Sequence, residues 1–203
     1  GKTWANVLRG KSAKGFRSWI FAPGEKARKW DQYRVEGVMG IGWPLLDMDL
    51  GNVKTEVELR NIYDEAYGDR ATDQDFRMIC DFLLRMDVGD RVFVKRGIGE
   101  IVGYGEVTSG YLFDGSRSEY KHLRKAKWLM NGTWSIPDGE RGLPMKTLTE
   151  IKEEGRLQAL VALIGQKNGD ELFGMRAFEL LSDLQEHPFQ SFYSDHGEEF
   201  SAE

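Results

Sequence analysis

Residues 18–43 read SWIFAPGEKARKWDQYRVEGVMGIGW, and they contain two β-prone runs with a turn and a helical segment between them. The first run, 18–22, ends at the turn signal Pro23-Gly24, and residues 25–33 have the apolar spacing of a short helix. The second run, 38–43, carries two glycines, which weaken a strand unless a backbone or a ligand must approach it closely. We therefore expect a strand, a short helix and a second strand in this order.

Two helix-start signals follow this opening. Thr55 with Glu58 has the spacing of a capping box, which predicts a helix that runs to about residue 67. Thr72 with Asp75 gives a similar start, and the apolar residues between 76 and 84 recur on one helical face. These signals predict two consecutive helices.

Short alternating or glycine-containing runs predict the remaining strands. We expect strands at 91–95, 100–108 and 120–130, a loop at 110–118, and a hairpin turn at Asn131-Gly132 before a return strand at 133–136. The strands do not alternate regularly with helices, which argues against a doubly wound parallel sheet.

The pattern becomes helical after Pro144. Thr147 with Glu150 resembles a further helix cap, and a helix interrupted near Gly155 and a second helix at 170–186 are expected to follow. The whole chain therefore predicts an α+β fold with a small curved mixed sheet or barrel, flanking helices and a C-terminal helical extension. The expected organisation is a flexible arm at 1–15, a barrel domain at 16–145, a helical extension at 146–186 and an acidic mobile tail at 187–203.

Composition narrows the class of protein. The 203 residues contain one cysteine, Cys80, which excludes an intrachain disulfide and a cysteine-rich zinc site. No apolar run approaches the roughly 20 residues that span a bilayer, and the first residues lack a signal-peptide pattern. We therefore expect a cytoplasmic protein without a membrane partner.

Charge is unevenly distributed, although the net charge is −5. Residues 1–35 are basic, residues 117–127 are basic again, and the segment from 170 onward is acidic. Attraction to phosphate depends more on a local patch than on the total charge. The two basic segments are thus compatible with nucleic-acid binding, and equally with ordinary solvated faces.

No catalytic constellation is visible. The three histidines, His122, His187 and His196, are too dispersed for a metal site, and no zinc-protease or nucleophile-elbow motif is present. Gly97-Ile98-Gly99 and Gly103-Tyr104-Gly105 lack the further spacing of a dinucleotide fingerprint and fit bends in a barrel better. We therefore expect a binding module without enzymatic activity, cofactor or metal.

Tryptophan is the conspicuous residue type. Trp30 lies in a basic helix, and Trp43 ends a strand beside Gly40 and Gly42, so both are at edges of predicted elements. A flat aromatic face stacks on a base with roughly 1–3 kcal/mol. Tryptophan is more often part of a core, but two rings at element edges are compatible with a pocket for a base.

Several stretches together resemble EVE/YTH-like domains, most closely those fused to modification-dependent restriction enzymes and Mcr-type GTPases. The resemblance spans about residues 16–136. The matching stretches are Trp19 to Asp31, Gly37 to Trp43 with Asp47, Phe82 to Met86, Gly89 to Val92, Ile101 to Val107, Tyr111, and Tyr120 to Trp128. The resemblance implies a PUA-like β-barrel without catalytic residues that holds a flipped or single-stranded modified base between aromatic side chains.

The resemblance also assigns roles to residues of this chain. It implies a base-binding cage of Trp30 and Trp43, with Tyr111 and Trp128 as further candidate walls. The expected readers of the base edge are backbone groups of Ala22, Pro23 and Gly24 and a carboxylate of Asp31 or Asp47. The expected phosphate contacts are Lys26, Arg28, Lys29, Lys121, His122 and Arg124.

Three functional interpretations remain open from the sequence. The first is a reader of methylated DNA in a restriction or phage-defence system, working with a fused or associated GTPase or nuclease. The second is a reader of modified RNA, because the contact to the 2′-hydroxyl that distinguishes RNA is not visible in a sequence. The third is a structural or protein-interaction module whose tryptophans all lie in the core.

Overall fold

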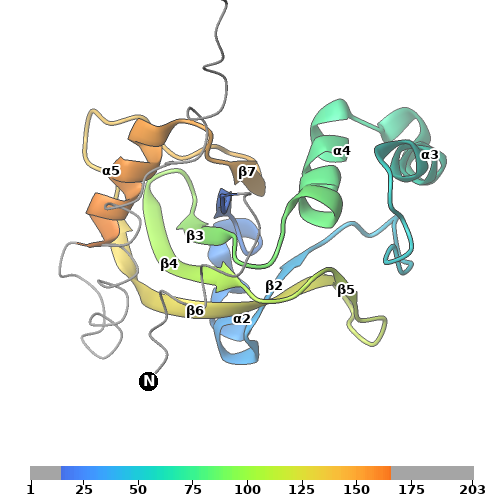
Figure 1. Ribbon diagram of the computed structural model, residues 1–203, viewed down its shortest axis with the longest axis horizontal. Coiled ribbons are helices and arrows are strands. Elements are labelled where there is room, and N and C mark those ends of the chain that lie inside the picture. Colours follow the sequence, from blue (N-terminus) through green and yellow to red (C-terminus); the bar gives the residue numbers. More distant parts are fainter. Residues whose placement is uncertain (1–14, 166–203) are drawn as a thin grey trace, which may run out of the picture.

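A curled seven-stranded sheet forms the centre of the part of the chain that the computed structural model describes, residues 15–165 (Figure 1). The helix expected at 170–186, the tail at 187–203 and nearly all of the expected arm lie outside the described residues. In chain order the elements are β1 (Ser18–Phe21), the 3-10 turn η1 (Glu25–Ala27), α2 (Trp30–Glu36), β2 (Val38–Ile41), α3 (Glu56–Tyr67), the 3-10 turn η2 (Gly68–Arg70), α4 (Asp73–Cys80), the π-helical turn η3 (Asp81–Arg85), β3 (Arg91–Arg96), β4 (Glu100–Val107), β5 (Leu112–Phe113), β6 (His122–Ser135), β7 (Leu148–Glu150) and α5 (Glu154–Ile164).

The strand order is β2-β6-β4-β3-β1-β7, and β5 pairs with β6 beside this path. β1 pairs with β3 in parallel, with Ile20 opposite Phe93, while the other pairs are antiparallel. Figure 1 shows the sheet curling, with α5 against one flank and α3 and α4 at the other. The expected fold class, α+β with a small curved mixed sheet and flanking helices, is therefore confirmed.

The helix starts agree with their local signals. The side chain of Thr55 accepts a hydrogen bond from the Glu58 backbone while the Glu58 carboxylate accepts from the Thr55 backbone, which forms the capping box of α3. Thr72 accepts from the Asp75 backbone at the start of α4. Both predicted helices are confirmed. None of the helices between residues 15 and 165 has the length and apolar character needed to cross a membrane.

Alternation along β1 divides the buried residues between two cores. Trp19 and Phe21 enter a core shared with α2, α3 and α4, whereas Ile20 enters a second core under α5. The second core includes Phe93 of β3 and Leu160 of α5, among others. The sheet is thus covered on both faces.

Two local predictions after residue 130 are wrong. β6 continues through Asn131 and Gly132 instead of turning there. An added Cβ at Gly132 would lie 2.7 Å from the ring of Trp134, so this glycine makes room for a neighbouring indole and not for a turn. The expected helix does not start at Thr147. This residue directly precedes β7, Glu150 is the last residue of β7, and β7 pairs with β1. The sheet therefore extends beyond the expected domain boundary at residue 145.

Candidate functional site

A cavity of about 310 Å³ opens where β2 ends and β6 begins. β2 and β6 pair with Ile41 opposite His122, and this register brings the loop after β2 against the loop before β6. The lining residues come from these two loops: Gly42, Trp43, Pro44, Asp47, Ser118, Glu119, Tyr120, Lys121 and His122. The cavity therefore has one aromatic ring from each loop.

Trp43 forms the inner wall. It is only 7% exposed, and its ring packs edge-on against Phe82 at 5.9 Å and beside His122 at 5.4 Å between ring centroids. These contacts hold the indole in one orientation at the end of β2. The structure places Trp43 just after the end of β2, at the edge of an element as expected.

Tyr120 forms the second aromatic wall, and its backbone is in the left-handed region with φ 55°. Such a conformation is uncommon for a residue other than glycine and indicates local strain. A Cβ added at Gly42 would lie 3.3 Å from Cε1 of Tyr120, and one at Gly24 would lie 2.9 Å from the tyrosine oxygen. Glycine at both positions thus lets the ring lie close to the two loops. Tyr120 was not expected as a cage residue.

His122 connects the Trp43 loop to β6. Its Nε2 donates to the carbonyl oxygen of Leu46 at 2.9 Å, and its Nδ1 accepts from the Tyr111 hydroxyl at 2.8 Å. The Tyr111 oxygen in turn accepts from the Leu50 backbone at 3.3 Å. Burial lowers the pKa of His122, in agreement with a neutral ring that serves as donor and acceptor at once.

The rim of the cavity is polar. Lys121 Nζ donates to both carboxylate oxygens of Asp47, at 2.6 and 2.7 Å. Ser118 adds a hydroxyl group to the lining of the cavity. These groups offer a cation, hydrogen-bond acceptors and a hydroxyl within the same opening, as recognition of a polar ring edge requires.

The loop that carries Tyr120 is held against α2 by ion pairs. Arg28 donates to Glu119 Oε1 at 3.1 Å and to Oε2 at 2.7 Å, and Lys29 lies 2.5 Å from Oε1. Hydrogen bonds from Arg28, then from Lys29, hold the pKa of Glu119 at about 2, well below its usual range. Arg117 pairs with Glu36 on α2 as well.

The positions of Trp30 and Trp128 correct the expected cage. Trp30 is 4% exposed, and its ring meets Trp128 edge-on with 4.8 Å between centroids. A Cβ at Gly103 would lie 2.2 Å from Trp30, while Asn131 accepts from the indole nitrogen at 3.0 Å. The two indoles therefore pack against each other and do not line the cavity. Tyr111 does not line the cavity, and its hydroxyl is hydrogen-bonded to His122 and to the Leu50 backbone.

Two of the expected phosphate contacts are buried. Both ring nitrogens of His122 are engaged, as described above. Arg124 is buried, and its guanidinium donates to the backbone carbonyls of Phe82, Leu83 and Ser109. Burial lowers the pKa of Arg124 to about 10. Arg124 therefore holds η3 against β6 instead of facing the solvent.

The expected readers of the base edge are also placed differently. The Ala22 backbone nitrogen donates to Thr147, and the Gly24 nitrogen donates to Ala22, so these two donors are used within the protein. The side chain of Asp31 is 91% exposed and lies 3.9 Å from Arg34. Lys26 is exposed on η1. Of the expected site residues, the structure brings together Trp43, Asp47, Lys121 and His122 at the cavity, with Arg28 and Lys29 paired to Glu119 beside them.

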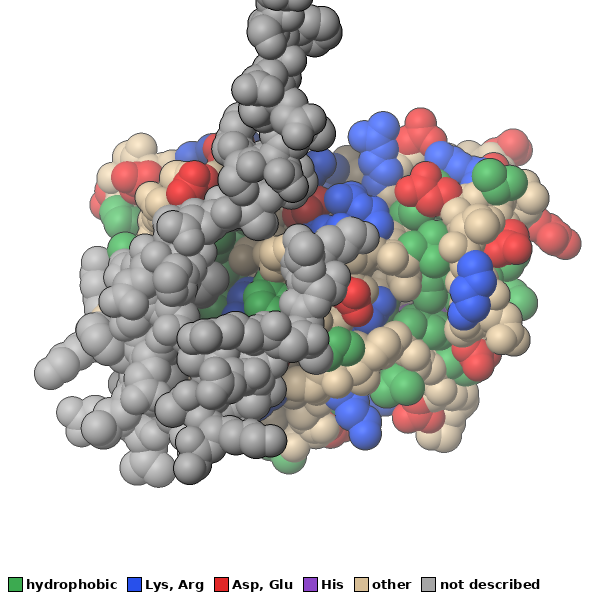
Figure 2. All heavy atoms as spheres, viewed as in Figure 1, with side chains coloured by type: hydrophobic (Ala, Val, Ile, Leu, Met, Phe, Trp, Pro, Cys, Tyr) green, Lys and Arg blue, Asp and Glu red, His purple; other side chains and the backbone are tan. Residues whose placement is uncertain are grey.

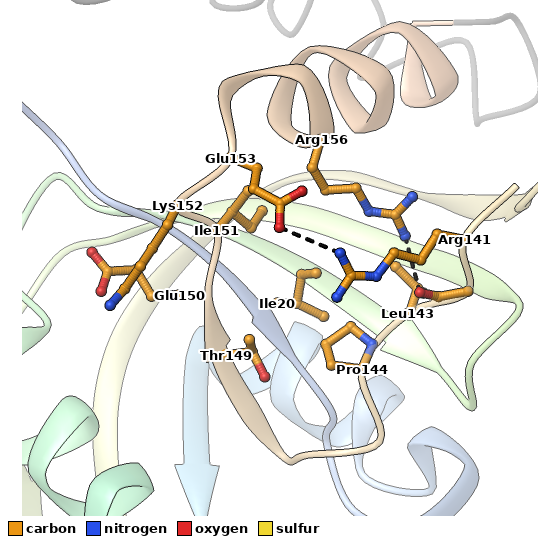
Figure 3. Close-up of a pocket in the computed structure, with 11 residues that line it drawn as sticks. Ile20, Arg141, Leu143, Pro144, Thr149, Glu150, Ile151, Lys152, Glu153 and Arg156 are labelled. Carbon is orange, nitrogen blue, oxygen red and sulfur yellow. Dashed lines mark hydrogen bonds and ion pairs between the residues drawn. The ribbon is translucent and has the colours of Figure 1, made fainter.

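A second cavity, of about 290 Å³, lies between β7, the start of α5 and residues 141–144 (Figure 3). Ile20 and Pro144 lie on its inner side, and the ion pair between Arg141 and Glu153 spans its mouth at 3.3 Å. None of its lining residues is aromatic. This cavity therefore lacks the stacking surface that the first one has.

Charges of both signs are mixed over the visible surface of α3 and α4, with hydrophobic side chains between them (Figure 2). No group of three or more His, Cys, Asp or Glu residues within 15–165 is placed to hold a metal ion. Of the two cavities described above, only the Trp43–Tyr120 cavity combines aromatic walls with a polar rim, and it is the candidate site.

Comparison with known proteins gives three results. A family model described as "Domain of unknown function (DUF8426)" matches residues 19–152. No curated protein matches the chain. Solved structures are similar at low identity. Among them are the YTH domain of Zygosaccharomyces rouxii MRB1 protein in complex with N6-methyladenosine RNA (12% identity, 80% of this chain, 89% of that chain, TM-score 0.41) and protein Atu2648 from Agrobacterium tumefaciens (16% identity, 70% of this chain, 90% of that chain, TM-score 0.32).

Proposed function

The chain belongs to the family described as Domain of unknown function (DUF8426), and we propose that it is a non-catalytic nucleic-acid reader that holds one modified base in the Trp43–Tyr120 cavity. The observation that carries the proposal is the cavity itself, in which two aromatic side chains from separate loops face an opening with a polar rim. Such a combination suits a flat heterocycle with hydrogen-bonding edges.

The energetics of base capture are compatible with this geometry. Removing a base from a duplex costs a few kcal/mol, and stacking returns roughly 1–3 kcal/mol for each base. Hydrogen bonds from the rim, at Asp47 or Ser118, would offset the remainder. A methyl group buried against Trp43 adds on the order of 1 kcal/mol, which corresponds to about fivefold in affinity.

We propose methylated DNA as the ligand, with Arg28, Lys29 and Lys121 near phosphates and Asp47 at the base edge. The choice of DNA, the role in a restriction or phage-defence system and the associated GTPase or nuclease follow from the sequence resemblance alone. Modified RNA is the second outcome that a binding experiment must distinguish, because stacking on Trp43 and Tyr120 is indifferent to the sugar.

The test is a binding panel measured by fluorescence anisotropy. It compares 5-methylcytosine, 5-hydroxymethylcytosine, N6-methyladenine and unmodified oligonucleotides, as single- and double-stranded DNA and as matched RNA. We expect one modified DNA to bind about fivefold or more tightly than its unmodified counterpart. Equal affinities for every modified and unmodified pair would reject the proposal, and a preference confined to RNA would replace DNA by RNA.

Tyr120→Ala tests the pocket itself. Removal of one stacking surface should weaken binding of the preferred oligonucleotide at least about tenfold, whereas Tyr120→Phe should keep most of the affinity because the ring remains. Phe16→Ala is the matched control, since Phe16 is also a partly exposed aromatic but lies beside Gly89 and Arg91 and does not line the cavity. Trp43→Ala is less informative, because it also removes a packing partner of Phe82. Equal losses in Tyr120→Ala and Phe16→Ala would place the binding elsewhere.

A further inference from the structure

Arg28 and Lys29 are two of the cations nearest the cavity, and both are already occupied. The carboxylate of Glu119 accepts two hydrogen bonds from the Arg28 guanidinium, at 2.7 and 3.1 Å, and lies 2.5 Å from Lys29 Nζ. One anionic group thus bridges two cations, with the fork of arginine matched to two oxygens. This is also the arrangement in which arginine and lysine hold a phosphate.

We propose that Glu119 occupies a phosphate-binding site in the unbound protein and that a phosphate of the bound nucleic acid displaces it from Arg28 and Lys29. The identity of the ligand rests on the proposed function. The site itself rests on the geometry of three residues, in which a carboxylate stands where two phosphate oxygens would be held. Glu119 therefore sets how readily the protein binds nucleic acid of any sequence.

Exposure makes this exchange possible. The side chains of Glu119 and Arg28 are 41% and 50% exposed, so a phosphate can reach the guanidinium without unfolding the loop. Ion pairs at such exposed positions contribute little to stability, and a ligand with higher charge competes for them. The low pKa of Glu119 keeps its carboxylate charged at neutral and mildly acidic pH, so competition by anions, not protonation, would release it.

The exchange is coupled to the cavity because Glu119 immediately precedes Tyr120. Arg28 Nη2 donates to the Tyr120 oxygen at 3.3 Å, and the guanidinium carbon lies 5.4 Å from the centre of the tyrosine ring. Lys29 Nζ lies 5.6 Å from the same ring. A phosphate at these two cations would therefore lie next to the ring on which the base stacks.

Glu119→Gln is the direct test, with anisotropy titrations of labelled methylated and unmodified duplex DNA. Loss of the competing charge should tighten binding of both duplexes about fivefold at low salt, and the gain should shrink as salt is raised. Glu100→Gln is the matched control, because Glu100 is similarly exposed, pairs with Arg96 and lies opposite Ser135 at the far end of β6. It makes the same change in net charge and should alter affinity less than twofold.

A second experiment distinguishes the covering of Arg28 and Lys29 by Glu119 from a general effect of its negative charge. In a protein that carries Arg28→Gln and Lys29→Gln, the further change Glu119→Gln should no longer tighten binding, since the cations it covers are absent. The inference is overturned if Glu119→Gln binds no more tightly than Glu100→Gln, or if its gain persists in this background. Circular dichroism confirms that each variant is folded.

The two proposals fail in different ways. Equal affinity of the wild type for methylated and unmodified duplexes would overturn the modified-base reader, while a gain in Glu119→Gln would still support the phosphate site. A wild type that prefers methylated DNA, with no gain in Glu119→Gln, would overturn the phosphate site alone. Absence of binding by both proteins would overturn both.

Discussion

His122 links the two loops of the cavity through a ring that must be neutral to make both of its hydrogen bonds. Its Nδ1 can accept from Tyr111 only when it carries no proton. Burial is the largest influence on the pKa of His122 and lowers it, as does the charge of Lys121, whereas the hydrogen bond to Leu46 and the charges of Asp47 and Asp49 raise it. The neutral ring is therefore part of the folded structure, and its protonation opposes folding.

Stability should consequently depend on pH through this residue. Because the pKa of His122 is lower in the folded protein than its ordinary value of about 6.5, its contribution is complete above that pH and is lost as the pH falls toward the folded value. We expect the Tm to fall between pH 7 and pH 5, by about 2–4 °C for each kcal/mol lost. Circular dichroism melts of wild type and His122→Gln check this prediction. Parallel pH profiles of the two proteins would contradict it.

Residue identity alone predicted part of the site. Trp43 could be anticipated, because an indole followed by proline after a glycine-rich strand indicates the end of that strand. Tyr120 could not, because the positive φ that turns its ring toward Gly42 is not encoded by any turn residue at that position. Burial is equally hidden, so Arg124 and His122 resembled surface cations in a basic segment although they bind backbone carbonyls inside the protein.

Glycines within β4 leave room for tryptophan rings because they have no Cβ atom. A Cβ at Gly103 would lie 2.2 Å from Trp30, whereas one at Gly99, just before the same strand, would meet nothing within 4 Å. These two positions offer a matched comparison, because both exchanges add one methyl group.

Gly103→Ala should destabilise the protein by about 1–3 kcal/mol, because Trp30 would have to leave its place between β4 and Trp128. Gly99→Ala should change the free energy of unfolding by less than about 0.5 kcal/mol. Urea denaturation followed by tryptophan fluorescence measures both. Similar midpoints for the two variants would mean that Trp30 is more loosely packed than the structure indicates.

Elements with strong local signals were predicted, and those defined by distant partners were not. The capping residues of α3 and α4 lie within four residues of each other, so the sequence displays them directly. β7 is only three residues long and exists because β1 presents a free edge to it. Asn131-Gly132 has the composition of a turn, yet β6 continues through it with a shift of register against β4, while Asn131 accepts from Trp30 and Gly132 leaves room for Trp134.

The sheet and both cores depend on residues beyond 145. β7 covers the edge of β1, and Leu160, Val161 and Ile164 of α5 close the second core over Ile20 and Phe93, among others. The expected boundary between a barrel and a separate helical extension therefore divides elements that pack together.

A chain that ends at residue 145 should accordingly fail to fold, whereas one that ends at residue 165 should unfold cooperatively. Loss of β7 and α5 would expose the apolar residues of the second core to water. Size-exclusion chromatography and circular dichroism melts compare the two truncations. If the chain that ends at residue 145 is monomeric and unfolds cooperatively, the first core is sufficient for folding.

The position of β1 between β3 and β7 has a consequence for biosynthesis. Ile20 leaves the ribosome long before Phe93 and Thr149, its two neighbours in the sheet, and at 5–20 residues per second the last of them follows roughly 6–26 s later. Until Phe93 follows, roughly 4–15 s after Ile20, the Trp19-Ile20-Phe21 segment has no native partner in the sheet, and it is the part of the nascent polypeptide where we expect a chaperone to bind.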